Sequence, residues 1–111
     1  MARAIFVMLD GLRPDALSPE RTPNLLDACA RGAATMTAQS VMPSMTLPCH
    51  TSLFHSVPPS RHGIVSNVWT PMARPVIGLF DVANDNGKLC AVIHNWEELR
   101  DLNRPGSLHY S

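Results

Sequence analysis

Two short runs of apolar residues stand out in the chain, AIFVML at positions 4–9 and LCAVI at positions 89–93. Neither run alternates between apolar and polar residues, and a continuously apolar run of this length is typical of a strand buried on both faces of a parallel sheet. The segment at 34–41 is rich in threonine and alternates weakly, so it predicts a further strand or an extended connection.

Between the two runs, apolar residues recur at helical spacing. Thr22 and Pro23 have the residue types of an N-cap and a first helical residue, and Gly32 is placed to end the helix that follows. Residues 76–84 repeat the helical spacing before an Asn-Gly pair, and residues 97–102 begin another helix. Strands that alternate with helices predict an α/β fold, with a parallel sheet and crossover helices. The predicted inner face of the first helix comprises Leu25, Leu26, Cys29 and Ala30.

The stretch from Met42 to Asn67 places a hydroxyl group at the predicted start of a helix. Thr46 is a good N-cap residue, and Pro48 is tolerated in a first helical turn, where backbone N–H groups have no intrahelical partners. The helix dipole at this end favours an anion such as a phosphoryl group, or an alkoxide on the threonine itself. From the residues alone, Thr46 is either a nucleophile or an N-cap. The predicted inward side of this helix comprises Leu47, Cys49, Leu53 and Phe54.

A proline-rich segment ends this helix. Residues 57–60, VPPS, stop the helix and the following residues turn the chain back, which predicts that Asn67 comes to lie beside Thr46. An asparagine that serves only the turn is the alternative.

A carboxylate follows the first apolar run directly, at Asp10. In open α/β sheets, ligands bind at the carboxyl ends of the strands. An unpaired carboxylate is costly to bury, so Asp10 is predicted to be solvated, to cap the next turn or to bind a cation.

Composition and charge narrow the classes of function. The chain has 111 residues, of which 45% are hydrophobic, and a formal net charge of zero, so it can build a modest core. The chain contains no run of basic residues and therefore shows no sequence signature of nucleic-acid binding. Its first residues lack the layout of a signal peptide and no apolar run approaches the ~20 residues that a bilayer needs, so the sequence predicts a cytoplasmic protein without a membrane segment. The three widely spaced cysteines indicate neither a disulfide framework nor a zinc knuckle.

Four motifs occur in order along the chain: VMLDGLR at 7–13, TPNL at 22–25, PSMTLPCH at 43–50 and SRHGIVSN at 60–67. Each motif is weak alone, but the ordered set resembles the type I phosphodiesterase and nucleotide pyrophosphatase group of the alkaline phosphatase superfamily. The resemblance implies an α/β, three-layer parallel-sheet fold of the alkaline-phosphatase type. On this resemblance, residues 1–111 form the N-terminal fragment of a single catalytic domain.

The resemblance also implies roles for three residues. Asp10 corresponds to a metal ligand, Thr46 to the metal-bound nucleophile, and Asn67 to the residue that binds a phosphoryl oxygen. The implied cofactors are two divalent metal ions, with zinc the expected metal and the remaining ligands beyond residue 111. The implied reaction is hydrolysis of a small phosphodiester or pyrophosphate substrate through a covalent phosphothreonine. The phosphoryl charge would be met by the metals, by Asn67 and by the N–H groups of Thr46 and Leu47.

Some positions depart from the family pattern. The group often has Asn-His after the proline of the nucleophile motif, whereas this chain has Cys49 and His50. Sulfatases of the superfamily use a cysteine with a following Pro and Arg, and Thr46, Pro48 and His50 in those places disfavour a sulfatase. A phosphomonoesterase, a phosphonate hydrolase or a phosphomutase of the superfamily remains an alternative, as does a non-catalytic fragment or binding module. The oligomeric state is open.

Overall fold

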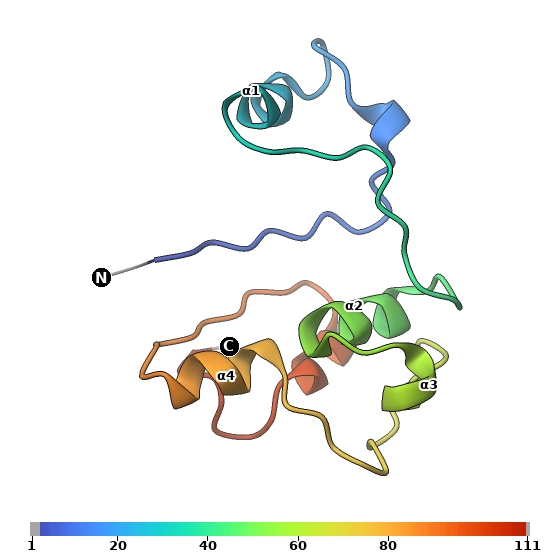
Figure 1. Ribbon diagram of the computed structural model, residues 1–111, viewed down its shortest axis with the longest axis vertical. Helices are drawn as coiled ribbons and strands as arrows, with labels where there is room; N and C mark the ends of the chain where they lie inside the picture. The colour runs from blue at the N-terminus through green and yellow to red at the C-terminus, as the bar shows by residue number, and fades with distance from the viewer. Residues whose placement is uncertain (1–2, 111) are drawn as a thin grey trace. The chain divides into compact units, whose positions relative to one another are not determined.

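The computed structural model describes residues 3–110 (Figure 1). The chain forms two compact units, one up to Gln39 and one from Ser40 onward. None of the helices found in residues 3–110 has the length and apolar character that spanning a membrane requires.

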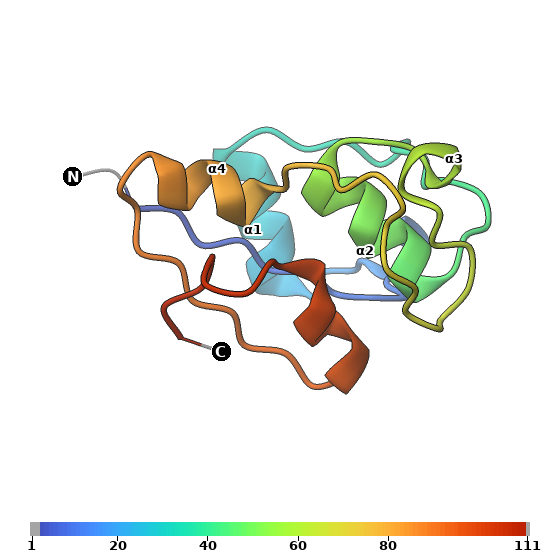
Figure 2. The same cartoon turned by 90° about the horizontal axis from the view of Figure 1, so that it is seen from below.

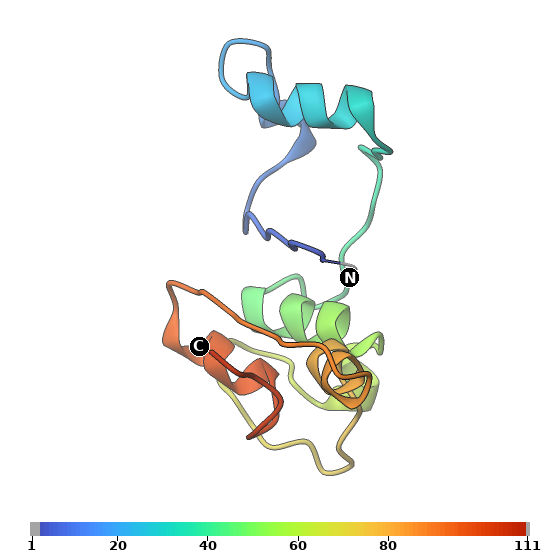
Figure 3. The ribbon, with the colours of Figure 1, turned by 90° about the vertical axis from the view of Figure 1, so that its left-hand side faces the viewer.

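The first unit contains a short 3-10 helix, η1 (Pro14–Ala16), and one α-helix, α1 (Pro23–Arg31), which Figure 3 shows side-on as a continuous helix. Thr22 is the N-cap of α1 and Pro23 its first residue, as the sequence predicts, because a proline there has no N–H that the helix would need. Gly32 is the C-cap, again as predicted. The Thr22 hydroxyl bonds to the backbone of Ser18 rather than to its own helix.

The predicted strands are not present in the described residues. Between residues 3 and 110 no β-strand forms, and the one pairing of this kind is an isolated parallel bridge between Ala91 and Tyr110. Most apolar residues of both runs are exposed, Ile5 by 92% and Ile93 fully, and none of them is buried. The strands predicted at 4–9 and 89–93 and the three-layer sheet are therefore not observed in the described residues. Residues 34–41 form no strand either, which leaves the alternative of a connecting segment. A doubly buried strand needs neighbouring strands and covering helices on both faces, and the described residues do not supply them.

The second unit is built around α2 (Thr46–His55). Helices α3 (Pro59–His62) and α4 (Leu79–Asp85) and the 3-10 helix η2 (Glu97–Leu102) all pack against it, as Figures 1 and 2 show. The predicted helices at 76–84 and 97–102 are thus present, the first beginning at Leu79 and the second in 3-10 form. Stacking of Phe54 on Phe80, with 5.2 Å between ring centroids, joins α2 to α4.

The core of the second unit combines few apolar residues with many polar ones. Its buried apolar members are Leu47, Ile64 and Leu102, with Trp69 and Trp96 among the half-buried residues packed around them. The predicted inward side of α2 is wrong for Leu53, which is 51% exposed. In its place the helix buries four polar residues whose side chains all find hydrogen-bond partners: His50, Thr51, Ser52 and His55.

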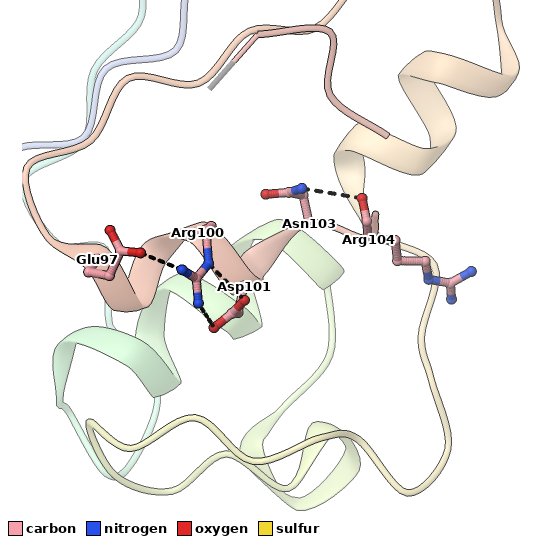
Figure 4. A network of polar contacts seen from close by, with 5 residues as sticks. All are labelled: Glu97, Arg100, Asp101, Asn103 and Arg104. Atoms are coloured by element: carbon pink, nitrogen blue, oxygen red, sulfur yellow. Dashed lines mark hydrogen bonds and ion pairs between the residues drawn. The ribbon is translucent and has the colours of Figure 1, made fainter. Parts of the chain in front are cut away.

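Charged side chains fix the ends of the later elements. Asp81 in α4 accepts a hydrogen bond from the N–H of Gly78 at 2.9 Å, which satisfies a donor at the helix start, and it pairs with Arg104 at 3.5 Å. On η2, the guanidinium of Arg100 lies between the carboxylates of Glu97 and Asp101 (Figure 4). The two ion pairs on η2 are largely exposed to solvent, so they add little to stability.

Candidate active site

Thr46 is the first residue of α2. Met45 before it has extended backbone angles and occupies the N-cap position, and the N–H of Cys49 bonds back to the Met45 carbonyl at 3.0 Å. The prediction that Thr46 is the N-cap is therefore wrong by one residue. Helix ends are set by backbone geometry that residue type only biases. The Thr46 side chain is half-buried, and its hydroxyl still belongs to the positive end of the helix.

Asn67 lies against this helix start. Its side-chain oxygen Oδ1 accepts a hydrogen bond at 3.0 Å from the N–H of Leu47, the residue after Thr46 and 20 positions earlier in the chain. The first N–H groups of a helix have no intrahelical acceptor, so Asn67 supplies one from outside the helix. The chain thus turns back as expected, and it brings a side-chain amide next to the residue that follows Thr46.

This contact corrects one expectation. The N–H of Leu47 was predicted to meet the charge of a phosphoryl group, but it donates to Asn67 Oδ1 instead. What the contact presents is the other half of the amide, a nitrogen with two donor hydrogens on the exposed side chain of Asn67.

His50 holds the other side of the first turn. Because a carbonyl can only accept, the ring Nδ1–H of His50 donates to the carbonyl oxygen of Thr46 at 2.8 Å. The ring is 5% exposed. His50 therefore has a structural role at the start of α2.

A second buried histidine connects α2 to the segment that carries Asn67. His62 Nε2 lies 2.9 Å from the hydroxyl oxygen of Ser52, and His62 Nδ1 accepts a hydrogen bond at 3.0 Å from the N–H of Ile64. Burial lowers the pKa of His62, and the nearby His55 lowers it further, while the Pro48 carbonyl opposes both effects. The sequence offered no signal for the Ser52 contact, because the two residues are ten positions apart in different helices.

Asp10 lies in a turn of the first unit. The N–H of Leu12 bonds to the carbonyl of Leu9 at 3.3 Å, and Gly11 has a φ of +72°, a conformation that glycine adopts without strain. The Asp10 residue is exposed. The structure describes Asp10 within the first unit and Thr46 and Asn67 within the second. Joint metal binding by Asp10 and Thr46 therefore stays a prediction, as does phosphoryl binding by Asn67.

Zinc ions in proteins are bound mainly by acidic, histidine and cysteine side chains. Between residues 3 and 110, no group of three or more of these side chains is placed to hold a metal ion. His50, His55 and His62 each use ring Nδ1 in a hydrogen bond within the second unit.

Comparison with known proteins identifies relatives over most of the chain. The sequence profile of the family described as type I phosphodiesterase / nucleotide pyrophosphatase matches residues 4–101. A protein of Schizosaccharomyces pombe, described as an uncharacterized pyrophosphatase/phosphodiesterase, is 40% identical over 63 residues. These residues make up 57% of this chain but 13% of the yeast protein. No solved structure gives a significant match.

Proposed function

Because the chain belongs to the type I phosphodiesterase / nucleotide pyrophosphatase family, we propose that its protein hydrolyses small phosphodiester or pyrophosphate substrates with Thr46 as the nucleophile. The observation that carries the proposal is the hydrogen bond from Leu47 N–H to Asn67 Oδ1. It fixes a side-chain amide beside the helix start that bears the threonine hydroxyl.

In the proposed reaction, the Thr46 oxygen forms a bond to phosphorus as the bond to the leaving group breaks. The product is a phosphothreonine that still carries the substrate's other ester group, together with a released alcohol or phosphate, which takes up a proton. Water then cleaves the phosphothreonine and restores the hydroxyl. The Asn67 amide nitrogen donates to a phosphoryl oxygen, where negative charge develops in both steps. The positive end of α2 favours the same charge.

Two residues of the chain have donor atoms suited to the metals that the family resemblance implies. The Asp10 carboxylate and the Thr46 hydroxyl both offer oxygen atoms as ligands. Carboxylate oxygens are common ligands of zinc. The described residues complete no metal site by themselves. We propose that Asp10 and Thr46 contribute to a site for two divalent ions, for which zinc is the expected metal. The remaining ligands would come from outside residues 1–111. When bound, such ions supply Lewis acidity toward the phosphoryl group.

The apolar runs at 4–9 and 89–93 have a place in this proposal. We propose that in the complete protein they are strands of the α/β sheet that the family implies, since their continuous apolar character fits burial on two faces. Asp10 would then lie at the carboxyl end of a strand, where ligands bind in such sheets.

Trapping the intermediate tests the proposed function. The complete, metal-loaded protein is quenched in acid during turnover of bis-para-nitrophenyl phosphate, and its peptides are mapped by mass spectrometry. A para-nitrophenyl phosphoryl group is expected on Thr46. The nearby Ser44, Thr51 and Ser52 serve as internal controls, and two of them, Thr51 and Ser52, are buried. The same group on any of these three in place of Thr46 would overturn the assignment.

A further inference from the structure

We propose that His62 is a positioning residue for Asn67: as a neutral imidazole with its proton on Nε2, it ties the segment 62–67 to helix α2 and so sets where the Asn67 amide lies. This inference rests on the proposed function for its effect on turnover, although the geometry it describes has its own test.

The hydrogen bonds of His62 determine where its proton is. A backbone N–H can only donate, so the contact from Ile64 N–H at 3.0 Å requires a lone pair on Nδ1. A neutral ring then carries its proton on Nε2, which donates to Ser52 Oγ at 2.9 Å. The ring, the serine and Ile64 are all buried, with exposed fractions of 2%, 8% and 0%. In such a site neither bond is replaced by water, so losing either leaves an unpaired polar group.

The same protonation state excludes another role for this pair. A serine activated by histidine must donate its hydroxyl proton to a ring nitrogen that has a lone pair. Here the lone pair on Nδ1 is used by Ile64 N–H, and Nε2 donates to Ser52. Ser52 is therefore an acceptor that anchors the ring, and it is not a second nucleophile.

Two anchors hold the segment 62–67 on one helix. At its beginning, His62 bonds to Ser52, and at its end Asn67 bonds to Leu47, five residues or about 7.5 Å earlier along α2. Between the anchors, Ile64 packs in the same core cluster as Leu47. Gly63, with φ of +80°, lets the chain turn sharply after His62. Loss of the first anchor should therefore move the second.

A double-mutant cycle in the complete, metal-loaded protein tests the inference, with kcat measured on bis-para-nitrophenyl phosphate. His62→Gln keeps a donor near the Nε2 position but removes the acceptor for Ile64 N–H, and we expect kcat to fall about 10- to 100-fold. Adding His62→Gln to Asn67→Ala should change kcat by less than about 2-fold, because the residue that His62 positions is already gone. Losses that multiply in the double variant would overturn the proposal.

Two further variants separate positioning from general damage. His55→Gln is the matched control, because His55 is also a buried histidine, 8% exposed against 2% for His62. Its Nδ1 bonds to Thr51 O and not to the segment 62–67. An equal loss of kcat in His55→Gln would show that His62 has only a structural role. If His62→Gln does not fold, Ser52→Ala takes its place, since it removes the other partner of the ring and should give the same non-additive pattern.

Amide hydrogen exchange gives a readout that does not depend on activity. The N–H of Leu47 is protected by Asn67 Oδ1, so His62→Gln or Ser52→Ala should speed its exchange about 3- to 10-fold, the equivalent of one hydrogen bond. His55→Gln should leave it unchanged. If Asn67→Ala has no effect on kcat but Leu47 exchange responds to His62, the proposed function fails and the positioning stands. Unchanged exchange at Leu47 in folded variants of His62 and Ser52 would overturn the positioning.

Discussion

The side-chain oxygen of Asn67 accepts the N–H of Leu47 at 3.0 Å, so a residue from the loop after α3 completes the first turn of α2. Asn67 therefore has two groups with separate tasks. Its oxygen stabilises the helix start, and its nitrogen is the proposed donor to the phosphoryl group. A substitution that removes the whole amide changes both stability and turnover.

The two tasks of Asn67 can be separated by a pair of variants. Asn67→Ala should lower kcat about 10²- to 10³-fold, the usual loss of one donor to a developing oxyanion. It should also cost about 0.5–2 kcal/mol of unfolding free energy, as the loss of a helix cap does. Asn67→Asp keeps an acceptor for Leu47 N–H but has no donor, so it should keep the stability and lose the turnover. Steady-state kinetics and urea unfolding measure both, and normal kcat in Asn67→Asp would refute the donor role.

Thr46→Ala should abolish nearly all turnover of the complete protein while the fold stays unchanged. Thr46 is the first helical residue and not the N-cap. The unfolding free energy of the Thr46→Ala variant should therefore differ from that of the wild type by less than about 1 kcal/mol. Thr46→Ser should retain part of the activity, because a primary hydroxyl can still attack phosphorus.

Thr51→Ala is the matched control for Thr46. Thr51 is a fully buried threonine of the same helix, and its hydroxyl donates to the Leu47 carbonyl at 2.7 Å. Removing this hydroxyl should lower the unfolding free energy by about 1–3 kcal/mol, as the loss of a buried hydrogen-bonding group usually does. The rate of the chemical step should not change. Full activity in Thr46→Ala would end the nucleophile assignment.

Acid should weaken the second unit through His62. Burial lowers the pKa of His62 in the folded state, whereas the unfolded chain takes up a proton near pH 6.5. Unfolding is thus coupled to proton uptake below that pH. The stabilisation from the neutral ring is fully present above about pH 6.5 and is lost as the pH falls, until the folded ring also becomes protonated.

Nuclear magnetic resonance can follow this titration at two atoms. Protonation must occur on Nδ1, which breaks the bond from Ile64 N–H, so the ring and the Ile64 amide should titrate with one midpoint, below the ordinary histidine value. In His62→Gln the Ile64 amide should show no such titration. An Ile64 amide that ignores the protonation of His62 would contradict the assigned tautomer.

The helices could be predicted from the sequence because their signals are local. Thr22 with Pro23 marks the start of α1, Pro58 and Pro59 follow the end of α2, and the Asn-Gly pair after α4 marks its end, each through backbone preferences within a few residues. The strands could not be confirmed in the same way. A strand exists only with a neighbour to pair with, and pairing is a property of residues far apart in the chain.

The site shows the same division between local and distant effects. The return of the chain from Pro59 to Asn67 could be predicted from turn residues, and Asn67 does reach the residue after Thr46. Which side of α2 is buried could not be predicted. Ser52 is buried because His62, ten residues away, bonds to it, and an apolar residue such as Leu53 stays outside.

The polypeptide of residues 1–111 by itself should show no hydrolysis and only weak zinc binding. Asp10 and Thr46 are too few ligands for a two-metal site, and the described residues contain no group of three acidic, histidine or cysteine side chains that could hold a metal ion. Isothermal titration calorimetry with zinc chloride measures the affinity, with Asp10→Asn as the matched control. Tight binding of two zinc ions, at micromolar affinity or better, would show that the ligand assignment is wrong.

The exposed apolar run at 4–9 has a consequence during synthesis of the protein on the ribosome. Its residues include Ile5, 92% exposed, and Val7, 71% exposed, and nothing between residues 3 and 110 pairs with the run as a strand. At about 5–20 residues per second, synthesis of the next hundred residues takes on the order of 5–20 s. For that time the nascent chain presents a β-prone segment to its surroundings. A segment that stays unpaired for this time is open to aggregation until a neighbouring strand is made.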